Sequence, residues 1–412
     1  MGSDTPKVLH DVLGIPLVEH VVHTALSAGV ERIVLVVSPE HREQIAQALT
    51  RYEQVSLAVQ DEPKGTAHAV LCGRSALEGF VGTALVLLGD APCISPASLR
   101  TLLAAHAERQ ASLSILSGEV DEPRGYGRIL RGPDGDPSAI VEEKDAPPHV
   151  LEVTEINSGV FALELPAMWH VLERIQPSPR TGEYYVTDAL ELARAGHETV
   201  IAVRAAAESD VLGVNTRSQL AQVIAVRRQQ INEGHMENGV TIVDPATTFV
   251  DARATIERDV RIEPFCVISG PCHLETGAVV GPFAHVRGGS TIGPGARIGN
   301  FVEVVRSRIG ANSRALHLAY LGDCQLGEDV NVGAGTVFAN YDGERHHETV
   351  LESGVSLGSN TVIVAPCRLA AHSRTGAGAV VTGDEVPWGE TWVGVPARPL
   401  HANTTDDAGG ER

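Results

Sequence analysis

The chain has 412 residues, enough for two or three domains, and 43% of them are hydrophobic, as in globular proteins. Its formal net charge is −20, spread along the chain, which argues against nucleic acid and anionic membranes as partners. The six cysteines form no CxxC pair, and no signal peptide or apolar run of membrane length is present. We therefore expect reduced thiols and a cytoplasmic location.

Residues 1–215 are predicted to alternate between strands and helices. Continuous apolar runs at 32–38 and 83–88 predict strands that are buried on both faces, and helical spacing predicts helices at 41–52 and 65–77. Further strands are predicted at 112–116, 139–142, 158–163 and 199–204. The pattern predicts an α/β domain, Rossmann-like, with a mostly parallel sheet.

Residues 216–239 are predicted to form a linker helix and a hinge. Asn215 or Thr216 can cap the start of the helix, and Gly234 is expected to end it. The next domain is predicted at 240–403, and residues 404–412 are predicted to be a disordered tail.

An aliphatic residue recurs every six residues from Ile256 to Val304 without a break. The repeat slips by one residue at Ile309 and again at Leu326, and a third run begins at Leu351. Neither helices nor flat strands have this period, but a solenoid of stacked coils does. Glycine follows the apolar residue at many steps, where a sharp corner has no room for a larger side chain. We therefore predict a left-handed parallel β-helix, a triangular prism of hexapeptide repeats.

A buried strand that ends in Gly89-Asp90 carries the first candidate site. Ligands of open α/β sheets bind at the carboxyl ends of strands, and Mg²⁺ prefers one or two side-chain oxygens together with phosphate oxygens. Asp90 alone could equally be a turn residue. The motifs around it are, in chain order, Pro6-Lys7-Val8-Leu9, Gln60, Gly65-Thr66, Gly125-Tyr126-Gly127-Arg128, Glu142-Glu143-Lys144-Asp145, Glu155-Ile156-Asn157-Ser158-Gly159, residues 182–188 and Gly213-Val214-Asn215.

With these motifs in this order, nearly the whole chain resembles the bacterial bifunctional N-acetylglucosamine-1-phosphate uridyltransferases/glucosamine-1-phosphate acetyltransferases. The resemblance implies transfer of UMP from UTP to N-acetylglucosamine-1-phosphate with Mg²⁺ as cofactor, a reaction that relies on positioning and charge neutralisation. It implies that Asp90 and Asn215 hold the metal. Among the implied UTP and UDP-sugar contacts, Lys7 would neutralise a phosphate, and Asn215 would also contribute. Gln60, Gly65 and Thr66 would read the uracil, and Gly127, Glu142 and Asn157 would contact the sugar.

The beginning of the chain departs from this family. The family has a glycine-rich segment of the form LxAGxGTRM before the motif that starts here at Pro6, whereas this chain reads Met1-Gly2-Ser3-Asp4-Thr5. Without that loop the triphosphate loses backbone N–H donors. We therefore expect either an N-terminally truncated domain with impaired uridyl transfer, or a translation start upstream of Met1.

In the repeat region, His317 interrupts an apolar rung, and Asn340 begins a loop that delays the repeat until Leu351. The resemblance implies that His317 is the general base that deprotonates the amine of glucosamine-1-phosphate for attack on acetyl-CoA, a task that suits histidine at neutral pH. Glu303 would orient it. The implied amino-sugar-phosphate contacts are Arg287, Tyr320 and Asn331, and the implied acetyl-CoA contacts are Ala334, Asn340, Tyr341, Ser359 and Ala377, with Asn340 also at the amino sugar.

Two positions differ from the family where it binds phosphate. Val305 replaces a lysine and Gly394 replaces an arginine, so Arg306 or Arg398 is expected to stand in. The resemblance also implies a homotrimer, and a product, UDP-N-acetylglucosamine, that feeds peptidoglycan and lipid envelope synthesis.

Two alternatives stay open at this stage. One is a sugar-1-phosphate nucleotidyltransferase whose hexapeptide tail is only structural. The other is a trimeric prism carbonic anhydrase with a three-histidine zinc site, for which the chain has candidate ligands at His285, His317, His346, His347 and His372.

Overall fold

The computed structural model describes residue 2 and residues 5–400, so the predicted tail at 404–412 lies outside the described residues. The chain divides into two compact units, Met1–Arg227 and Arg228–Arg412, and the division falls inside helix α8 (Arg217–Glu237). No helix in the described part of the chain is both long and apolar enough to cross a membrane.

A six-stranded sheet forms the centre of the first unit, with the order β10-β6-β9-β7-β8 and with β5 paired to β9. Its strands are β5 (Gly82–Val86), β6 (Leu113–Glu119), β7 (Arg128–Arg131), β8 (Pro137–Val141), β9 (Glu155–Leu165) and β10 (Val200–Arg204). A separate parallel pair is made by β3 (Ile33–Val37) and β4 (Val55–Val59), and a short antiparallel pair by β1 (Asp11–Val12) and β2 (Ile15–Pro16).

The predicted α/β class is confirmed, but the direction of the strands differs from the prediction. Only β10 and β6 pair in parallel within the six-stranded sheet, and β9 runs antiparallel to β5, β6 and β7. The sheet is therefore mixed. A strand that is buried on both faces has the same apolar composition whichever way it runs, so the sequence pattern did not reveal this.

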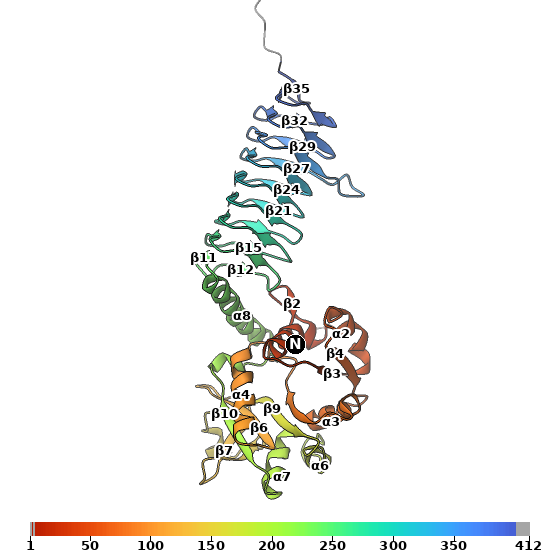
Figure 1. The fold of residues 1–412 in the computed structure, drawn as a ribbon, viewed down its shortest axis with the longest axis vertical. Helices are drawn as coiled ribbons and strands as arrows, with labels where there is room; N and C mark the ends of the chain where they lie inside the picture. The colour runs from red at the N-terminus through yellow and green to blue at the C-terminus, as the bar shows by residue number, and fades with distance from the viewer. Residues whose placement is uncertain (1, 3–4, 401–412) are drawn as a thin grey trace, which may run out of the picture. The chain divides into compact units, whose positions relative to one another are not determined.

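Helices pack around the strands of the first unit. The helices are α1 (Leu17–Ser27), α2 (Arg42–Ala48), α3 (Thr66–Cys72), α4 (Pro96–Glu108), α5 (Pro148–Leu151), α6 (Trp169–Glu173) and α7 (Ala189–Ala195), with 3-10 turns η1 (Lys7–Leu9), η2 (Pro39–His41), η3 (Arg74–Leu77), η4 (Glu143–Asp145), η5 (Val186–Asp188) and η6 (Glu208–Val211). The Ser95 hydroxyl caps α4 by accepting from Ser98 N at 3.2 Å. Helix α4 packs on β6 and β10 (Figure 1).

The second unit is a prism of stacked coils (Figure 1). It has three faces, and each face is a sheet of parallel strands. Face 1 contains β11 (Thr241–Ile242), β14 (Arg261–Ile262), β17 (Val279–Val280), β20 (Arg297–Asn300), β23 (Arg314–His317) and β26 (Asn331–Val332). Face 2 contains β12 (Phe249–Val250), β15 (Val267–Ile268), β18 (His285–Val286), β21 (Glu303–Val305), β24 (Tyr320–Gly322), β27 (Val337–Ala339), β29 (Val362–Val364) and β32 (Val380–Val381).

Face 3 contains β13 (Thr255–Ile256), β16 (His273–Leu274), β19 (Thr291–Ile292), β22 (Arg308–Ile309), β25 (Cys324–Leu326), β28 (Thr349–Leu351), β30 (Cys367–Leu369) and β33 (Glu385–Val386). The strands β31 (Arg374–Thr375), β34 (Thr391–Val393) and β35 (Arg398–Pro399) form a further three-stranded sheet. Isolated bridges from Asn331 to Ser356 and from Ser356 to Arg374 connect β26 with β31.

The repeat residues form the core of the prism, as predicted. Val250 pairs with Ile268 and Ile268 with Val286, so each residue stacks on its equivalent one coil later. These side chains and their equivalents up to Val381 and Val386 are buried in one continuous cluster. The predicted hexapeptide β-helix is therefore confirmed.

The linker helix is longer than predicted. It passes through Gly234 and ends at Glu237, and the chain turns at Gly239, where φ is +89°. A glycine inside a helix costs only about 1 kcal/mol, which the remaining turns can offset, whereas the left-handed conformation at Gly239 does stop a helix.

Two glycines give opposite predictions for stability. A Cβ on Gly299 would overlap the carbonyl oxygen of Leu316 in the next coil, whereas a Cβ on Gly234 would meet nothing within 4 Å. We expect Gly299→Ala to destabilise the prism by about 1–3 kcal/mol through overpacking. We expect Gly234→Ala to stabilise α8 by about 0.5–1 kcal/mol. Urea unfolding followed by circular dichroism measures both, and a Gly299→Ala variant as stable as the unchanged chain would contradict the steric argument.

Candidate functional site

In the first unit, Lys7 joins two candidate metal ligands that are far apart in the sequence. Its ammonium group donates to the Asp90 carboxylate and, at 3.0 Å, to Asn215 Oδ1. The main chain connects the same segments, because Val214 N donates to Asp90 O at 3.0 Å. The structure therefore brings together three of the residues that the sequence analysis assigned to the metal-phosphate site.

This cluster fits Mg²⁺. A carboxylate oxygen and an amide oxygen already share one cation, the Lys7 ammonium, and hard divalent ions prefer such oxygens. No group of three or more His, Cys, Asp or Glu side chains suited to a metal occurs within the described residues. Asp90 and Asn215 alone would therefore leave most coordination positions to phosphate oxygens and water.

The residues predicted to read the uracil form a second cluster. Gln60 Nε2 donates to Gly65 O at 3.2 Å and lies 2.9 Å from His68 Nδ1. Gly65 has a φ of +106°, and a Cβ there would lie 2.5 Å from the Tyr184 carbonyl oxygen, so the position requires glycine. The Thr66 hydroxyl accepts from Val186 N at 3.0 Å, which joins the start of α3 to the segment that follows Tyr184.

The residues predicted to contact the sugar form a third cluster: Gly127 directly precedes β7, Glu142 directly follows β8, and Asn157 lies in β9. Asn157 N donates to Gly127 O at 2.9 Å, and a Cβ on Gly127 would lie 3.4 Å from Glu142 Oε1. Burial, and next the charge of Asp188, raises the pKa of the Glu142 carboxyl. The Asn157 Oδ1 atom accepts from Gly159 N at 3.0 Å, so this amide is turned toward its own strand.

Tyr126 is a candidate site residue that the sequence analysis did not assign. Burial raises the pKa of its phenol, the main chain at Gly213 opposes this shift, and the Asp90 carboxylate adds to it. Tyr126 therefore lies beside both segments of the Lys7–Asp90–Asn215 cluster. Its place between two glycines in the motif that contains Gly127 was the available signal.

In the second unit, one corner of the prism aligns His317 with the predicted coenzyme residues. The residue that follows each corner residue donates its main-chain N–H to the corner residue of the preceding coil. Leu318 N donates to Asn300 O at 2.9 Å, and Gly335 N donates to His317 O at 3.3 Å. The row continues from Asn360 N to Ala334 O and from Gly378 N to Ser359 O, both at 2.7 Å. The residues at this corner in successive coils are Asn300, His317, Ala334, Ser359 and Ala377. His317 is exposed, and its neighbours on the C-terminal side are small.

Glu303 and Arg287 lie on face 2, around the corner from His317. Arg287 Nη1 and Glu303 Oε1 form an ion pair at 2.9 Å, and Glu303 stacks on Tyr320 of the next coil. The neighbour of His317 in the sheet register is Asn300, and no hydrogen bond joins Glu303 to His317 among the described residues. The orienting role of Glu303 stays a prediction.

The residues at the two departures from the family pattern are placed as follows. Val305 is buried and pairs with Gly322, and Gly394 has a φ of +94°. Arg306 binds the Asp323 carboxylate through Nε and Nη2, and Arg398 donates to the Ala397 carbonyl at 2.8 Å. Arg306 is therefore already engaged with a carboxylate, and its role as a substitute for the missing lysine stays a prediction.

Three further predicted site residues lie on the prism. Asn340 and Tyr341 lie in the loop between β27 and β28, and Asn331 lies on face 1. Asn340 is buried and donates to Asp323, and Tyr341 is exposed with its hydroxyl donating to Gly343 O at 2.6 Å. Asn331 is half-buried in β26, in register with Arg314.

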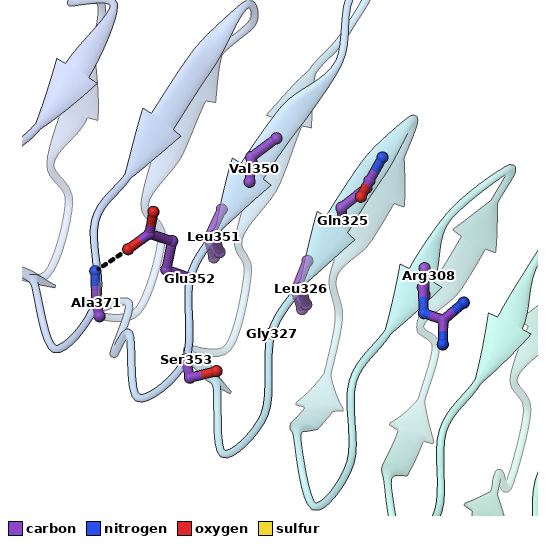
Figure 2. A pocket seen from close by; sticks show the side chains of 9 residues that line it. All are labelled: Arg308, Gln325, Leu326, Gly327, Val350, Leu351, Glu352, Ser353 and Ala371. Carbon is purple, nitrogen blue, oxygen red and sulfur yellow. Dashed lines mark hydrogen bonds between the residues drawn. The ribbon is translucent and has the colours of Figure 1, made fainter.

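A shallow hollow of about 490 Å³ lies elsewhere on the prism, on face 3 (Figure 2). Its walls include the outward side chains of Arg308 and Gln325 and the Glu352 carboxylate, which accepts from Ala371 N at 2.9 Å (Figure 2). None of the predicted site residues lines it, and we assign it no role.

Comparison with known proteins decides the family. Residues 2–211 match the family model described as nucleotidyl transferase, and residues 253–288 and 271–306 match the bacterial transferase hexapeptide model. Curated proteins named bifunctional protein GlmU match over most of both chains. The protein of Syntrophomonas wolfei is 37% identical over 94% of this chain and 93% of its own length. That of Corynebacterium diphtheriae is 37% identical over 99% and 96%, and that of Syntrophotalea carbinolica is 40% identical over 94% and 90%.

The chain belongs to the GlmU family. It is accordingly a bifunctional transferase of UDP-N-acetylglucosamine synthesis that combines uridyltransferase and acetyltransferase activities, as the sequence motifs implied. Membership in the GlmU family favours this assignment over the two alternatives, a nucleotidyltransferase with a structural tail and a prism carbonic anhydrase.

Proposed function

We propose that the Lys7–Asp90–Asn215 cluster is the catalytic centre for uridyl transfer. A phosphate oxygen of N-acetylglucosamine-1-phosphate attacks the α-phosphorus of UTP, and pyrophosphate leaves. Asp90 and Asn215 would hold Mg²⁺, which would supply charge neutralisation at the phosphates. Lys7 adds a second positive charge, Gln60, Gly65 and Thr66 bind the uracil, and Gly127, Glu142 and Asn157 bind the sugar. The contact of one ammonium group with both oxygen ligands is the observation that supports this role most directly.

We propose that the corner row of the prism is the site of acetyl transfer from acetyl-CoA to glucosamine-1-phosphate. His317 accepts a proton from the sugar amine, whose nitrogen then attacks the thioester carbonyl, and the thiolate of the coenzyme leaves. The alignment of His317 with Ala334, Ser359 and Ala377 supports this proposal, because small side chains leave space for an extended coenzyme. The Ser359 hydroxyl is a donor for the developing oxyanion. Arg287, Tyr320, Asn331 and Asn340 bind the amino sugar and its phosphate.

We further propose that the chain forms a homotrimer through an aromatic ridge on the prism. Phe265, Phe283 and Phe301 occupy one corner position in successive coils, with ring centroids 4.9 and 5.3 Å apart, and Leu318 follows in the next coil. These four residues, here called the aromatic ridge, are 51%, 44%, 58% and 63% exposed.

The backbone makes the aromatic ridge unusual. All four residues have φ between 51° and 60°, a conformation that bulky side chains rarely adopt. Beyond Leu318 the same corner is occupied by Gly335, Asn360 and Gly378, which tolerate it. Exposed rings on a strained corner call for a covering partner. A second copy of the prism fits, because its coils repeat with the same spacing.

We expect Phe283→Asp to abolish self-association of the full chain. Aspartate tolerates the left-handed conformation, so the coil should still fold, but a carboxylate in the apolar contact costs free energy of desolvation. Light scattering measures the mass in solution. Val81→Asp is the matched control, because Val81 is exposed but lies in the first unit. A Phe283→Asp chain with the mass of the unchanged oligomer would contradict the assignment of the ridge.

We place the enzyme in the cytoplasm, with UTP, acetyl-CoA and the two sugar phosphates as its small-molecule partners. The free thiols of all six cysteines support a reducing compartment. The net charge of −20 argues against nucleic acid or membrane partners.

A further inference from the structure

The carboxylate of Asp323, directly after β24, holds three side chains. Arg306 binds it at two points, with Nε 2.6 Å from Oδ1 and Nη2 2.7 Å from Oδ2. Asn340 Nδ2 donates to Oδ2 at 2.5 Å, and His346 Nδ1 lies 3.2 Å from the same oxygen. Arg306 first, then Asn340 and His346, hold the pKa of Asp323 below its usual value. The group is therefore an ionised acceptor at neutral pH.

These contacts tie down the loop that interrupts the repeat. Asn340 begins the loop, His346 lies near its end, and Thr349 N, at the start of β28, donates to the main-chain oxygen of Asp323 at 3.0 Å. The loop also closes on itself, because the Asp342 carboxylate accepts from Glu344 N and Arg345 N, both at 2.8 Å. Asp323 thus fastens a compact loop to the coil at three points.

Asp323 also determines which way the Asn340 amide faces. An ionised carboxylate can only accept hydrogen bonds, so Asn340 must present its NH₂ group to Asp323 and its Oδ1 elsewhere. Gly322 provides the space, since a Cβ there would lie 2.5 Å from Asn340 Nδ2 and 2.7 Å from the Tyr320 hydroxyl. The amide nitrogen is thereby held between Asp323 and the side of Gly322 that Tyr320 also faces, and Oδ1 is turned away from Asp323 as an acceptor, for which the amine of an amino sugar is a matching donor.

We propose that Asp323 is a positioning residue for acetyl transfer: it orients the Asn340 amide and fixes the loop that Asn340 begins, without touching substrate itself. This inference rests on the proposed acetyltransferase function of the second unit. Arg306 neutralises the carboxylate, so the device adds no net negative charge beside the sugar phosphate.

The test is a double-mutant cycle in the full chain, with the kcat of acetyl transfer as readout. Asp323→Asn and Asn340→Ala are each expected to lower kcat by about 10²-fold, the cost of a misplacement of about 1 Å. The double variant should lose little more, because both changes remove the same interaction. Asp329→Asn is the matched control: it is the same chemical change at an exposed aspartate of the prism that also has a positive φ, 55°, and it should keep kcat near that of the unchanged chain.

Independent losses that multiply in the double variant would overturn the positioning role, as would an Asp323→Asn variant with a lower melting temperature but unchanged kcat. Light scattering checks that each variant assembles. If Asp323→Asn does not fold, Asp323→Glu takes its place: it keeps the charge but moves the carboxylate, and full kcat in that variant would overturn the inference. An unchanged chain that acetylates no glucosamine-1-phosphate would instead contradict the proposed function.

Discussion

Replacing His317 with alanine is expected to lower acetyl transfer by about 10²–10⁴-fold, the usual contribution of a general base. The alanine variant keeps its backbone bond from Gly335 N and the buried repeat residues of its coil, so the prism should fold and assemble normally. The measurement is the rate of acetyl-CoA consumption with glucosamine-1-phosphate, at several pH values. Without the imidazole, activity should rise with pH, because more of the amine is then already deprotonated.

His273→Ala is the matched control for this experiment. His273 is also on the prism, but on face 3, where its Nε2 atom lies 2.9 Å from Glu257 Oε1 and none of the predicted site residues is near it in the register. This control should acetylate normally. Acetylation at the unchanged rate by His317→Ala would show that another group, or the substrate itself, removes the proton.

In a chain extended at its start by the glycine-rich segment of the family, Asp90→Asn is expected to lower uridyl transfer by about 10²-fold or more and to leave acetyl transfer intact. The amide has nearly the same shape as the carboxylate but lacks the charge that draws Lys7 and a divalent cation, and such metal sites supply several kcal/mol. The readouts are pyrophosphate release and the Mg²⁺ concentration needed for half-maximal rate, which should increase. The rise in melting temperature on adding Mg²⁺ with UTP, which needs no turnover, should shrink as well.

Asp121→Asn is the control, because Asp121 is exposed in the same unit and lies outside the three clusters. Equal loss of both activities in Asp90→Asn would indicate misfolding rather than a lost metal ligand. An unchanged Mg²⁺ requirement would remove Asp90 from the metal site.

The sequence predicted the prism more fully than the first unit. Three hexapeptides make one coil, so every third repeat residue returns to the same face. There it pairs with its equivalent in the next coil, as Val250 does with Ile268, and the six-residue period therefore predicts the packing directly. The direction of β9 has no comparable signature, since burial on two faces demands apolar residues in either direction. The end of α8 was misplaced for a related reason: glycine only weakens a helix, and Gly234 does not stop it.

The functional residues were predicted through ordered motifs rather than through geometry. Spacing alone could not show that Lys7 reaches both Asp90 and Asn215, because that contact depends on how the sheet and its loops fold. Asp323 was missed although it stands in the same segment as His317. Its role depends on Arg306 and Asn340, each in a neighbouring coil, and such contacts follow only from the register of the coils.

The long loop between β27 and β28 shows that a corner of the prism can change without a change in the packing of its apolar interior. The coil that contains this loop is longer than the others, yet Phe338 still pairs with Ile363, and Leu351 with Leu369, in the ordinary register. A solenoid behaves as a one-dimensional series in which each coil interacts only with the next, so an insertion at a corner disturbs no distant contact. A corner can therefore acquire polar residues while the apolar interior stays the same, and the specificity of such a site can change without a change of fold.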